Sequence, residues 1–187
     1  MQQSASPQYI LEEVLLTADR LEGLETIDIG PLINELELYE NIEKPYITGS
    51  ITFLDSAGVS IAIGGFKGTE RLQIKIKVYG ADNISPLVKN FIVTGVESSV
   101  KNERTELILL HFIEEHAYMS NARRIRESIQ GPTSRALKSV FQGQLNRTLE
   151  TPTEVFNDSK VVDRNILVNY GGKTPLELIE YIRERYY

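Results

Sequence analysis

The two histidines, His111 and His116, are the residues best suited to acid–base or metal chemistry, and both lie in the segment HFIEEH. Histidine changes charge near neutral pH and is the commonest metal ligand. The zinc motifs H-E-x-x-H and H-x-x-E-H place two histidines four residues apart, on one face of a helix. Here the spacing is five, and in a strand an odd spacing points two side chains to opposite faces. The spacing therefore favours ordinary strand and loop histidines over a metal site.

The glycine-rich segment GGFKGTE, residues 64–70, has the composition of a phosphate-binding loop without its order. A phosphate loop reads G-x-x-x-x-G-K-[ST] and leads into a helix whose first N–H groups bind the phosphate. This segment leads into an alternating strand pattern instead. No G-x-S-x-G nucleophile motif is present either. We therefore expect a turn before a strand, and no nucleotide site.

Paired carboxylates offer one further route to catalysis. Glu35 and Glu37 alternate with leucines, so both project from one face of a strand, where they could do acid–base work. Such pairs are more often the solvated side of a sheet. A hydrolase that uses carboxylates on a β-barrel therefore stays as a lesser alternative. The main expectation is a protein that is not an enzyme, with no catalytic residue, no cofactor and no metal.

Composition narrows the class of protein. The chain has 187 residues, 41% of them hydrophobic, and no cysteine, so it can bury a core but forms no disulfide. No apolar run approaches the roughly 20 residues that span a bilayer. The start, MQQSASPQ, lacks the basic and apolar parts of a signal peptide. We expect a soluble protein made in the cytoplasm, without a membrane partner.

The net charge of −6 argues against a general nucleic-acid binder, which needs a basic surface. Its distribution is uneven. Ten acidic residues lie between Leu11 and Lys44, and the sign reverses near Ala122. The basic group there consists of Arg123, Arg124 and Arg126. For any single one of these residues, solvated surface is a more common role than a binding site.

Residues 32–56 are the clearest structural unit of the sequence. Leu36 and Leu38 alternate with glutamates, and the alternation resumes over residues 47–53, which predicts a β-hairpin with one buried face. Residues 40–45 are polar and end in Pro45, which lacks the N–H that a ladder needs. Pairing should therefore resume only after this proline.

Other strands follow from the same period-two pattern. Residues 9–17 fit a helix or a strand, and we favour a strand. Residues 72–78 alternate most clearly, and residues 91–100 and 106–113 predict a second hairpin in which Gly95 marks a bulge or bend. The glycine-rich residues 56–69 predict a loop that briefly rejoins the sheet.

The pattern becomes helical past Tyr118. Apolar residues on one face predict a helix that starts at Ser134 and ends within residues 143–146. A last helix begins at Thr174, with Pro175 in the first turn and Glu177 at the capping-box position. It stops in mid-pattern at Tyr187, so we expect that the natural protein continues further or that this chain is truncated.

These segments resemble the N-terminal part of baseplate hub proteins from contractile-tailed bacteriophages. The resemblance rests on LINELELYENIEKPYITGSITFLDS and GTERLQIKIKVYG, which are similar to the family's tail-tube-like domain. It continues in ELILLHFIEEHAYMSNARRIRESIQGPTSRALKSVF and TPLELIEYIRERYY, which look like the closing strand and the first helices of a second domain. It covers nearly the whole chain as a pattern of strands and turns, without a catalytic motif.

The resemblance implies an α+β fold, mainly β. A flexible arm over residues 1–8 would precede a tail-tube-like antiparallel β-barrel or sandwich domain over residues 9–120. Residues 121–187 would begin a second α+β domain that is truncated here. Hubs of this family are trimers whose tube-like domains form a ring, located in the tail baseplate of the virion and assembled in the host bacterial cytoplasm.

The family also implies partners. The ring joins a central spike protein to the tail tube or its initiator, contacts baseplate wedge proteins, and lets DNA pass through its channel without specific binding. We hypothesise that Glu35, Glu37 and Glu40 line this channel. We hypothesise further that Arg123, Arg124 and Arg126 contact an acidic partner. A hub or spike protein of a bacterial contractile injection or secretion system, with the same architecture, is the main alternative.

Overall fold

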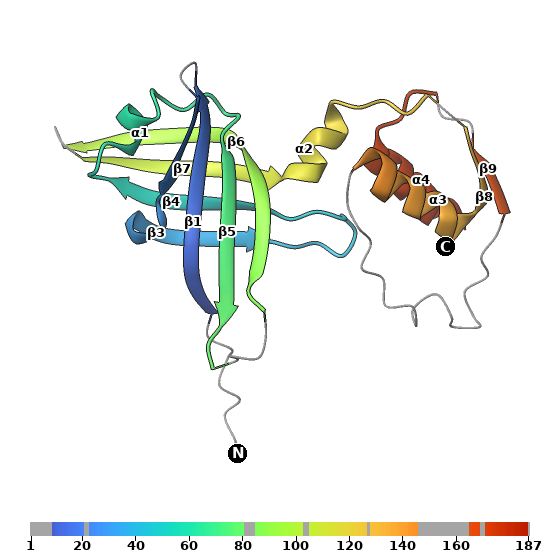
Figure 1. Cartoon of the computed structure of the whole chain (residues 1–187), viewed down its shortest axis with the longest axis horizontal. Coiled ribbons are helices and arrows are strands. Elements are labelled where there is room, and N and C mark those ends of the chain that lie inside the picture. Colours follow the sequence, from blue (N-terminus) through green and yellow to red (C-terminus); the bar gives the residue numbers. More distant parts are fainter. Residues whose placement is uncertain are drawn as a thin grey trace. The chain divides into compact units, whose positions relative to one another are not determined.

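The computed structural model describes residues 9–20, 23–80, 85–102, 105–126, 128–145, 165–168 and 171–186. The expected arm over residues 1–8 lies outside this part of the chain. The chain divides into two compact units, one that ends at Glu115 and one that begins at His116 (Figure 1). Among the described residues, no helix is both long enough and apolar enough to cross a membrane.

The first unit is built almost entirely from strands. In chain order its elements are β1 (Tyr9–Arg20), β2 (Gly23–Asp28), the 3₁₀ turn η1 (Gly30–Leu32), β3 (Ile33–Tyr39), β4 (Thr48–Asp55), α1 (Val59–Ala62), β5 (Arg71–Val78), β6 (Leu87–Asn102) and β7 (Thr105–Glu114).

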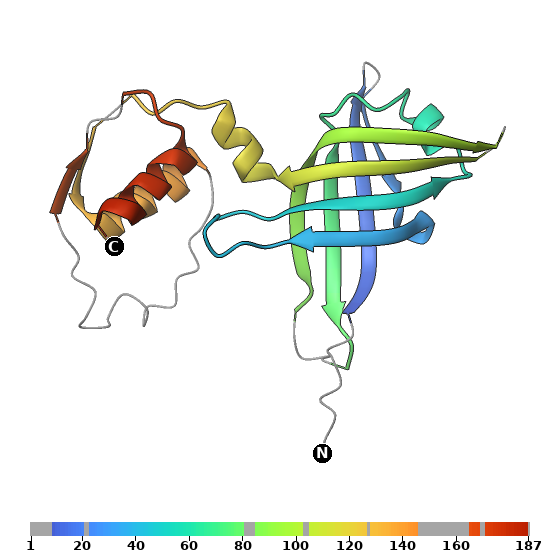
Figure 2. The ribbon, with the colours of Figure 1, turned by 180° about the vertical axis from the view of Figure 1, so that it is seen from behind.

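All seven strands belong to one antiparallel sheet, in the order β2-β1-β5-β6-β7-β4-β3. Strands β1 and β5 run across the direction of β3, β4 and β7, so the sheet curls into a half-barrel (Figure 1, Figure 2). The 16-residue strand β6 serves both halves, since its first part pairs with β5 and the rest with β7. The predicted class, mainly antiparallel β with a few helices, is confirmed. The two layers expected of a barrel or sandwich are the two halves of this single sheet.

The curl lets the sheet cover its own apolar face. Phe91 and Phe112 meet edge to face in the middle of the core, with ring centroids 4.8 Å apart and an interplanar angle of 61°, an arrangement that aromatic pairs prefer. The remaining core residues alternate along the strands, as period-two burial requires, apart from Ile29 at η1 and Val59 and Ile63 at α1. They are Val14, Leu16, Ala18, Ile29, Ile51, Phe53, Val59, Ile63, Leu72, Ile74, Val93, Ile108 and Leu110.

The predicted hairpin is confirmed. Tyr39 pairs with Thr48 at the turn end of the hairpin, so the ladder resumes only after Pro45. Gly49, Ile51 and Phe53 are buried on the inner face of β4, whereas Leu38 on edge strand β3 is 37% exposed. The inner face is therefore incompletely covered near the end of β3. The predicted strands over residues 9–17, 72–78, 91–100 and 106–113 are also present, and the ladder shifts register between Val93 and Gly95 as expected of a bulge.

The prediction for residues 56–69 was wrong in one respect. This segment does not rejoin the sheet but forms the short helix α1. The Asp55 carboxylate accepts the N–H groups of Val59 at 2.8 Å and Ser60 at 2.9 Å, which caps the first turn. Val59 and Ile63, four residues apart, are buried, while Ile61 is 85% exposed. The apolar residues therefore follow a helical spacing here.

The second unit combines a two-stranded sheet with helices. It contains α2 (Glu115–Asn121), which starts on the last residue of the first unit, β8 (Ile129–Pro132), α3 (Thr133–Ser139), the π-helical turn η2 (Val140–Gln144), β9 (Asn165–Val168) and α4 (Pro175–Tyr186). The predicted helix near residue 134 is present as α3 and η2. Strand β8 directly precedes α3 and pairs with β9. It was not predicted.

The start of α4 confirms the predicted capping box. The N–H of Thr174 donates to Oε2 of Glu177 at 2.7 Å, and the N–H of Glu177 donates to Oγ1 of Thr174 at 3.2 Å. Two N–H groups that the helix itself leaves unpaired are thereby satisfied. Leu178 and Ile182 lie on the buried face, as the apolar spacing predicts.

We expect Gly49→Ala to destabilise the half-barrel by about 1–3 kcal/mol, because an added methyl group has no room. Its carbon would lie 2.4 Å from the carbonyl oxygen of Glu37 and 2.6 Å from Cζ of Phe112. Urea unfolding measures the change. Gly95→Ala is the matched control, since the added carbon would meet His111 at an ordinary 3.5 Å. Equal unfolding midpoints for the two variants would contradict the close packing at Gly49.

We expect Glu177→Gln to weaken the pH dependence of unfolding. The hydrogen bond from the N–H of Thr174 lowers the pKa of Glu177 below its ordinary value. A lowered folded-state pKa contributes stability that is present above the unfolded pKa and is lost as pH falls through the folded pKa. Thermal unfolding at neutral pH and near pH 3 tests this, with the exposed Glu184→Gln as control. Acidification should lower the unfolding temperature less in Glu177→Gln than in the unaltered chain. An equal decrease in both would count against the capping role.

Candidate functional site

The two acidic side chains of β3 lie on the outward face of the β3–β4 hairpin. Glu35 and Glu37 project from β3 and Glu40 follows it, and all three are exposed. The Glu37 carboxylate accepts hydrogen bonds from the hydroxyls of Tyr39 and, at 3.3 Å, Ser50. The bond from Tyr39, followed by desolvation and the negative charge of Glu37, raises the pKa of the Tyr39 hydroxyl. The outward face is thus an acidic surface held by hydrogen bonds between β3 and β4.

The arginine group belongs to the second unit. Arg123, Arg124 and Arg126 are all exposed, whereas Ile125 between them is buried. The segment is fixed by main-chain and side-chain bonds: the N–H of Ile125 donates to the carbonyl of Lys173 at 3.0 Å, and the Arg123 guanidinium donates to the carbonyl of Gln144. The acidic hairpin and the arginines therefore lie in different units, and each is a surface in its own right.

The histidines do not form a site. His111 lies exposed on β7, with Nε2 3.3 Å from Oε1 of Glu97, and His116 is buried in α2. His116 therefore lies in a helix, where the sequence had suggested a strand or loop. Within the described part of the chain, no group of three or more His, Asp and Glu residues could hold a metal ion.

The glycine-rich loop uses its N–H groups internally. Glu70 is 2% exposed, and its carboxylate accepts the N–H groups of Lys67 at 2.7 Å, Gly68 at 2.9 Å and Thr69 at 3.1 Å. Consecutive N–H groups that converge in this way are what a phosphate would need. A carboxylate of the same chain occupies that position, so the loop is closed by its own glutamate.

Glu114 is a second buried carboxylate with a structural role. Its Oε1 lies 2.8 Å from Nζ of Lys89, and its Oε2 accepts the N–H of Ile47 at 2.9 Å. The main-chain N–H of Glu114 also donates to the carbonyl of Ile47 at 3.0 Å. These bonds hold the end of the β3–β4 connection, where the chain enters β4, against β6 and β7. Both carboxylates are thus engaged in positioning the backbone.

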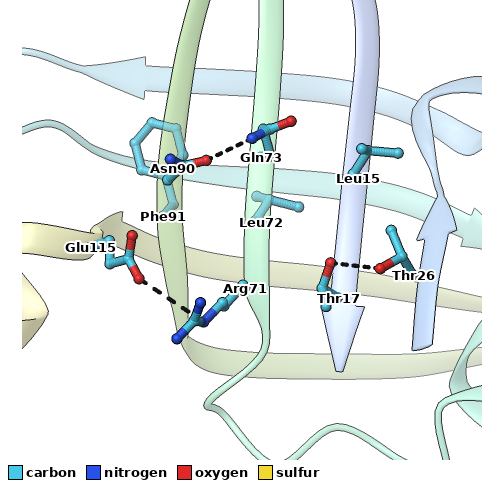
Figure 3. A pocket seen from close by; sticks show the side chains of 9 residues that line it. All are labelled: Leu15, Thr17, Thr26, Arg71, Leu72, Gln73, Asn90, Phe91 and Glu115. Atoms are coloured by element: carbon cyan, nitrogen blue, oxygen red, sulfur yellow. Dashed lines mark hydrogen bonds and ion pairs between the residues drawn. The ribbon is translucent and has the colours of Figure 1, made fainter. Parts of the chain in front are cut away.

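A hollow of about 400 Å³ lies on the outer face of the sheet, over β2, β1, β5 and β6 (Figure 3). Cross-strand pairs form its walls: the hydroxyls of Thr17 and Thr26 are 3.0 Å apart, and the Gln73 amide donates to Asn90 at 2.9 Å. Nε of Arg71 lies 3.9 Å from a Glu115 oxygen at one side. The nine lining residues are Leu15, Thr17, Thr26, Arg71, Leu72, Gln73, Asn90, Phe91 and Glu115.

The chemistry of this hollow is that of a binding surface. Its lining includes no histidine, cysteine, lysine or serine, and its one carboxylate, that of Glu115, lies 3.9 Å from the guanidinium of Arg71. It does offer amide and hydroxyl groups, the half-buried side chain of Leu15, and the guanidinium of Arg71, whose side chain is 70% exposed. Sequence reasoning missed the hollow. The alternation of residues 72–78 put Gln73 on the wet face, but no local pattern shows which strands lie beside β5.

No protein-family model matches the sequence, and no curated protein matches it. Two solved structures align with about two thirds of the chain. A tail protein from Neisseria meningitidis MC58 aligns over 70% of this chain and 34% of its own, at 7% identity and a TM-score of 0.39. The Francisella PdpA–VgrG complex aligns over 69% of this chain and 20% of its own, at 12% identity and a TM-score of 0.43. This chain therefore spans about a third of the length of the Neisseria chain and a fifth of the length of the Francisella chain.

We expect Glu70→Ala to open the glycine-rich loop and to cost about 1–3 kcal/mol, because three buried or half-buried N–H groups lose their acceptor. Lys67 lies inside this loop, so trypsin should cleave after it much faster in the variant. Glu97→Ala is a suitable control, since its side chain is 72% exposed. Unchanged cleavage after Lys67 would mean that the carboxylate does not hold the loop.

Proposed function

We propose that this chain is a structural protein of a contractile tail: a baseplate hub that joins the central spike to the tail tube through a trimeric ring with a DNA channel. Residues 9–120 form its tube-like domain and residues 121–187 begin a second α+β domain. The hub acts by assembly and not as an enzyme. Its partners are two further copies, the spike protein, the tube or tube-initiator protein and the baseplate wedge proteins.

The observation that carries this proposal is the open half-barrel itself. The segments that resemble hub proteins build it, and β2 and β3 remain as the edges of its sheet. An open edge presents unpaired N–H and C=O groups that can pair with another chain. A protein that works as part of a ring has a use for such edges, because neighbouring copies can cover them.

The acidic hairpin suits a channel wall. Glu35 and Glu37 are exposed on the outward face of β3, and Glu40 is exposed in the connection that follows it. Carboxylates on the wall repel the phosphates of DNA, so the polymer slides past without binding. The arginine group, in contrast, suits binding to an acidic partner. Exposed guanidinium groups at positions 123, 124 and 126 form strong paired hydrogen bonds with carboxylates of a partner chain.

The same architecture would serve a hub or spike protein of a bacterial contractile injection or secretion system. Because a phage hub and an injection-system hub would share this geometry, the two proposals are distinguished by the particle that contains the protein. Electron microscopy of that particle tests the hub proposal directly. We expect three copies in a ring between spike and tube; a peripheral position, or a monomer that forms no ring, would overturn the proposal.

We expect the triple variant Glu35→Lys, Glu37→Lys and Glu40→Lys to assemble rings that retain duplex DNA at low salt, because the channel wall becomes basic. The readout is DNA bound to purified rings, and raising the salt should release it. Lysine substitutions at Glu97, Glu180 and Glu184 change the net charge equally and serve as control. Equal DNA binding by the two variants would show that the hairpin does not face the channel.

A further inference from the structure

The turn that joins β3 and β4 presents an isoleucine to solvent. Ile42 is 100% exposed. The turn is held by Asn41, whose side-chain oxygen accepts the N–H of Glu43 at 2.8 Å and whose carbonyl accepts the N–H of Lys44 at 2.9 Å. We call residues 41–44 the hairpin tip. Its backbone is preorganised, so little conformational freedom is lost if it binds something.

The composition of the tip is unusual for a solvent-exposed turn. Turns favour Gly, Pro, Asn, Asp and Ser, and a branched apolar side chain held wholly in water is unfavourable. Here Ile42 stands between Asn41 and the charged residues Glu43 and Lys44. An apolar side chain on a preorganised turn can act as an anchor that fills a partner's pocket.

The hollow on the outer face of the sheet has matching chemistry. Leu15 is half-buried on this face and can contact an apolar group, whereas Leu72 and Phe91 also border the hollow but are core residues. Arg71 and Glu115 lie at one side of it as a cation and an anion 3.9 Å apart. The tip likewise carries an anion and a cation side by side. Glu43 is thus complementary to Arg71, and Lys44 to Glu115.

Tip and hollow belong to the same unit, yet the tip does not occupy the hollow of its own chain, since Ile42 is wholly exposed. The β3–β4 connection extends past the neighbouring strands (Figure 1, Figure 2). A second copy can therefore receive it.

We propose that the hairpin tip of one copy inserts Ile42 into the hollow of a second copy. The contact joins two different surfaces, so each copy gives one tip and offers one hollow, and repetition closes a ring when the rotation fits. This inference rests on the hub proposal and names the contact that closes its ring. It leaves the outward carboxylates of β3 free to face the channel.

Cross-linking tests the contact, because the sequence contains no cysteine. One copy carries Ile42→Cys and a second, tagged copy carries Gln73→Cys on the wall of the hollow. Mild oxidation of the mixture should give a tagged cross-linked dimer. Ile61→Cys replaces Ile42→Cys in the control, since Ile61 is 85% exposed on α1 and should give none. Equal yields from both mixtures, or no dimer from the first, overturn the proposal.

Self-association provides the second measurement. We expect Ile42→Ser to weaken it by about tenfold or more, as for loss of an anchor residue, and Ile61→Ser to leave it unchanged. Arg71→Glu should also weaken it, and Glu43→Arg in the same chain should restore part of the loss. Self-association that Ile42→Ser leaves unchanged contradicts the proposal.

The two proposals can fail separately. A three-copy ring in the particle, without the cross-link, keeps the hub function and overturns the tip contact. If the cross-link forms but imaging places the protein away from any spike or tube, the contact stands and the hub function is overturned.

Discussion

The fold depends on the need of a single sheet to cover its own apolar face. Strand β6 takes part in both halves of the sheet, and its bulge at Gly95 lies where the pairing with β7 shifts register. The curl brings Phe91 against Phe112. Phe112 in turn lies so close to Gly49 that no side chain fits there. The core, the position of the hairpin and the outer surfaces all follow from this packing.

The acidic residues of the first unit divide into two kinds. Asp55, Glu70 and Glu114 are nearly inaccessible and bind N–H groups of turns and strand ends. Burial of a carboxylate is unfavourable unless such partners are present. Glu35 and Glu37 face solvent and contribute surface charge. The net charge of the sequence therefore overstates the acidity of the surface, and burial decides which carboxylates a partner can meet.

Local patterns predicted most of the elements but not the hollow. Alternation located the strands, and Thr174, Pro175 and Glu177 located the start of α4, because each signal arises within a few residues. Alternation failed at α1, where the Asp55 cap favours a helical turn, and it missed β8, which depends on pairing with distant β9. The exposed glutamates and arginines were recognisable as surface. The pairing of Gln73 with Asn90 required the sheet order.

Strands β2 and β3 are consecutive in the chain but occupy opposite edges of the sheet. The short segment between them contacts both halves of the half-barrel: η1 packs near β1 and β4, and the N–H of Ile29 donates to the carbonyl of Val14 at 2.9 Å. The hairpins β1–β2 and β3–β4 are local and can form early, whereas β1 meets β5 only after a long loop closes. Folding should be slow, in the millisecond-to-second range of all-β domains, with closure of the half-barrel as its rate-limiting step.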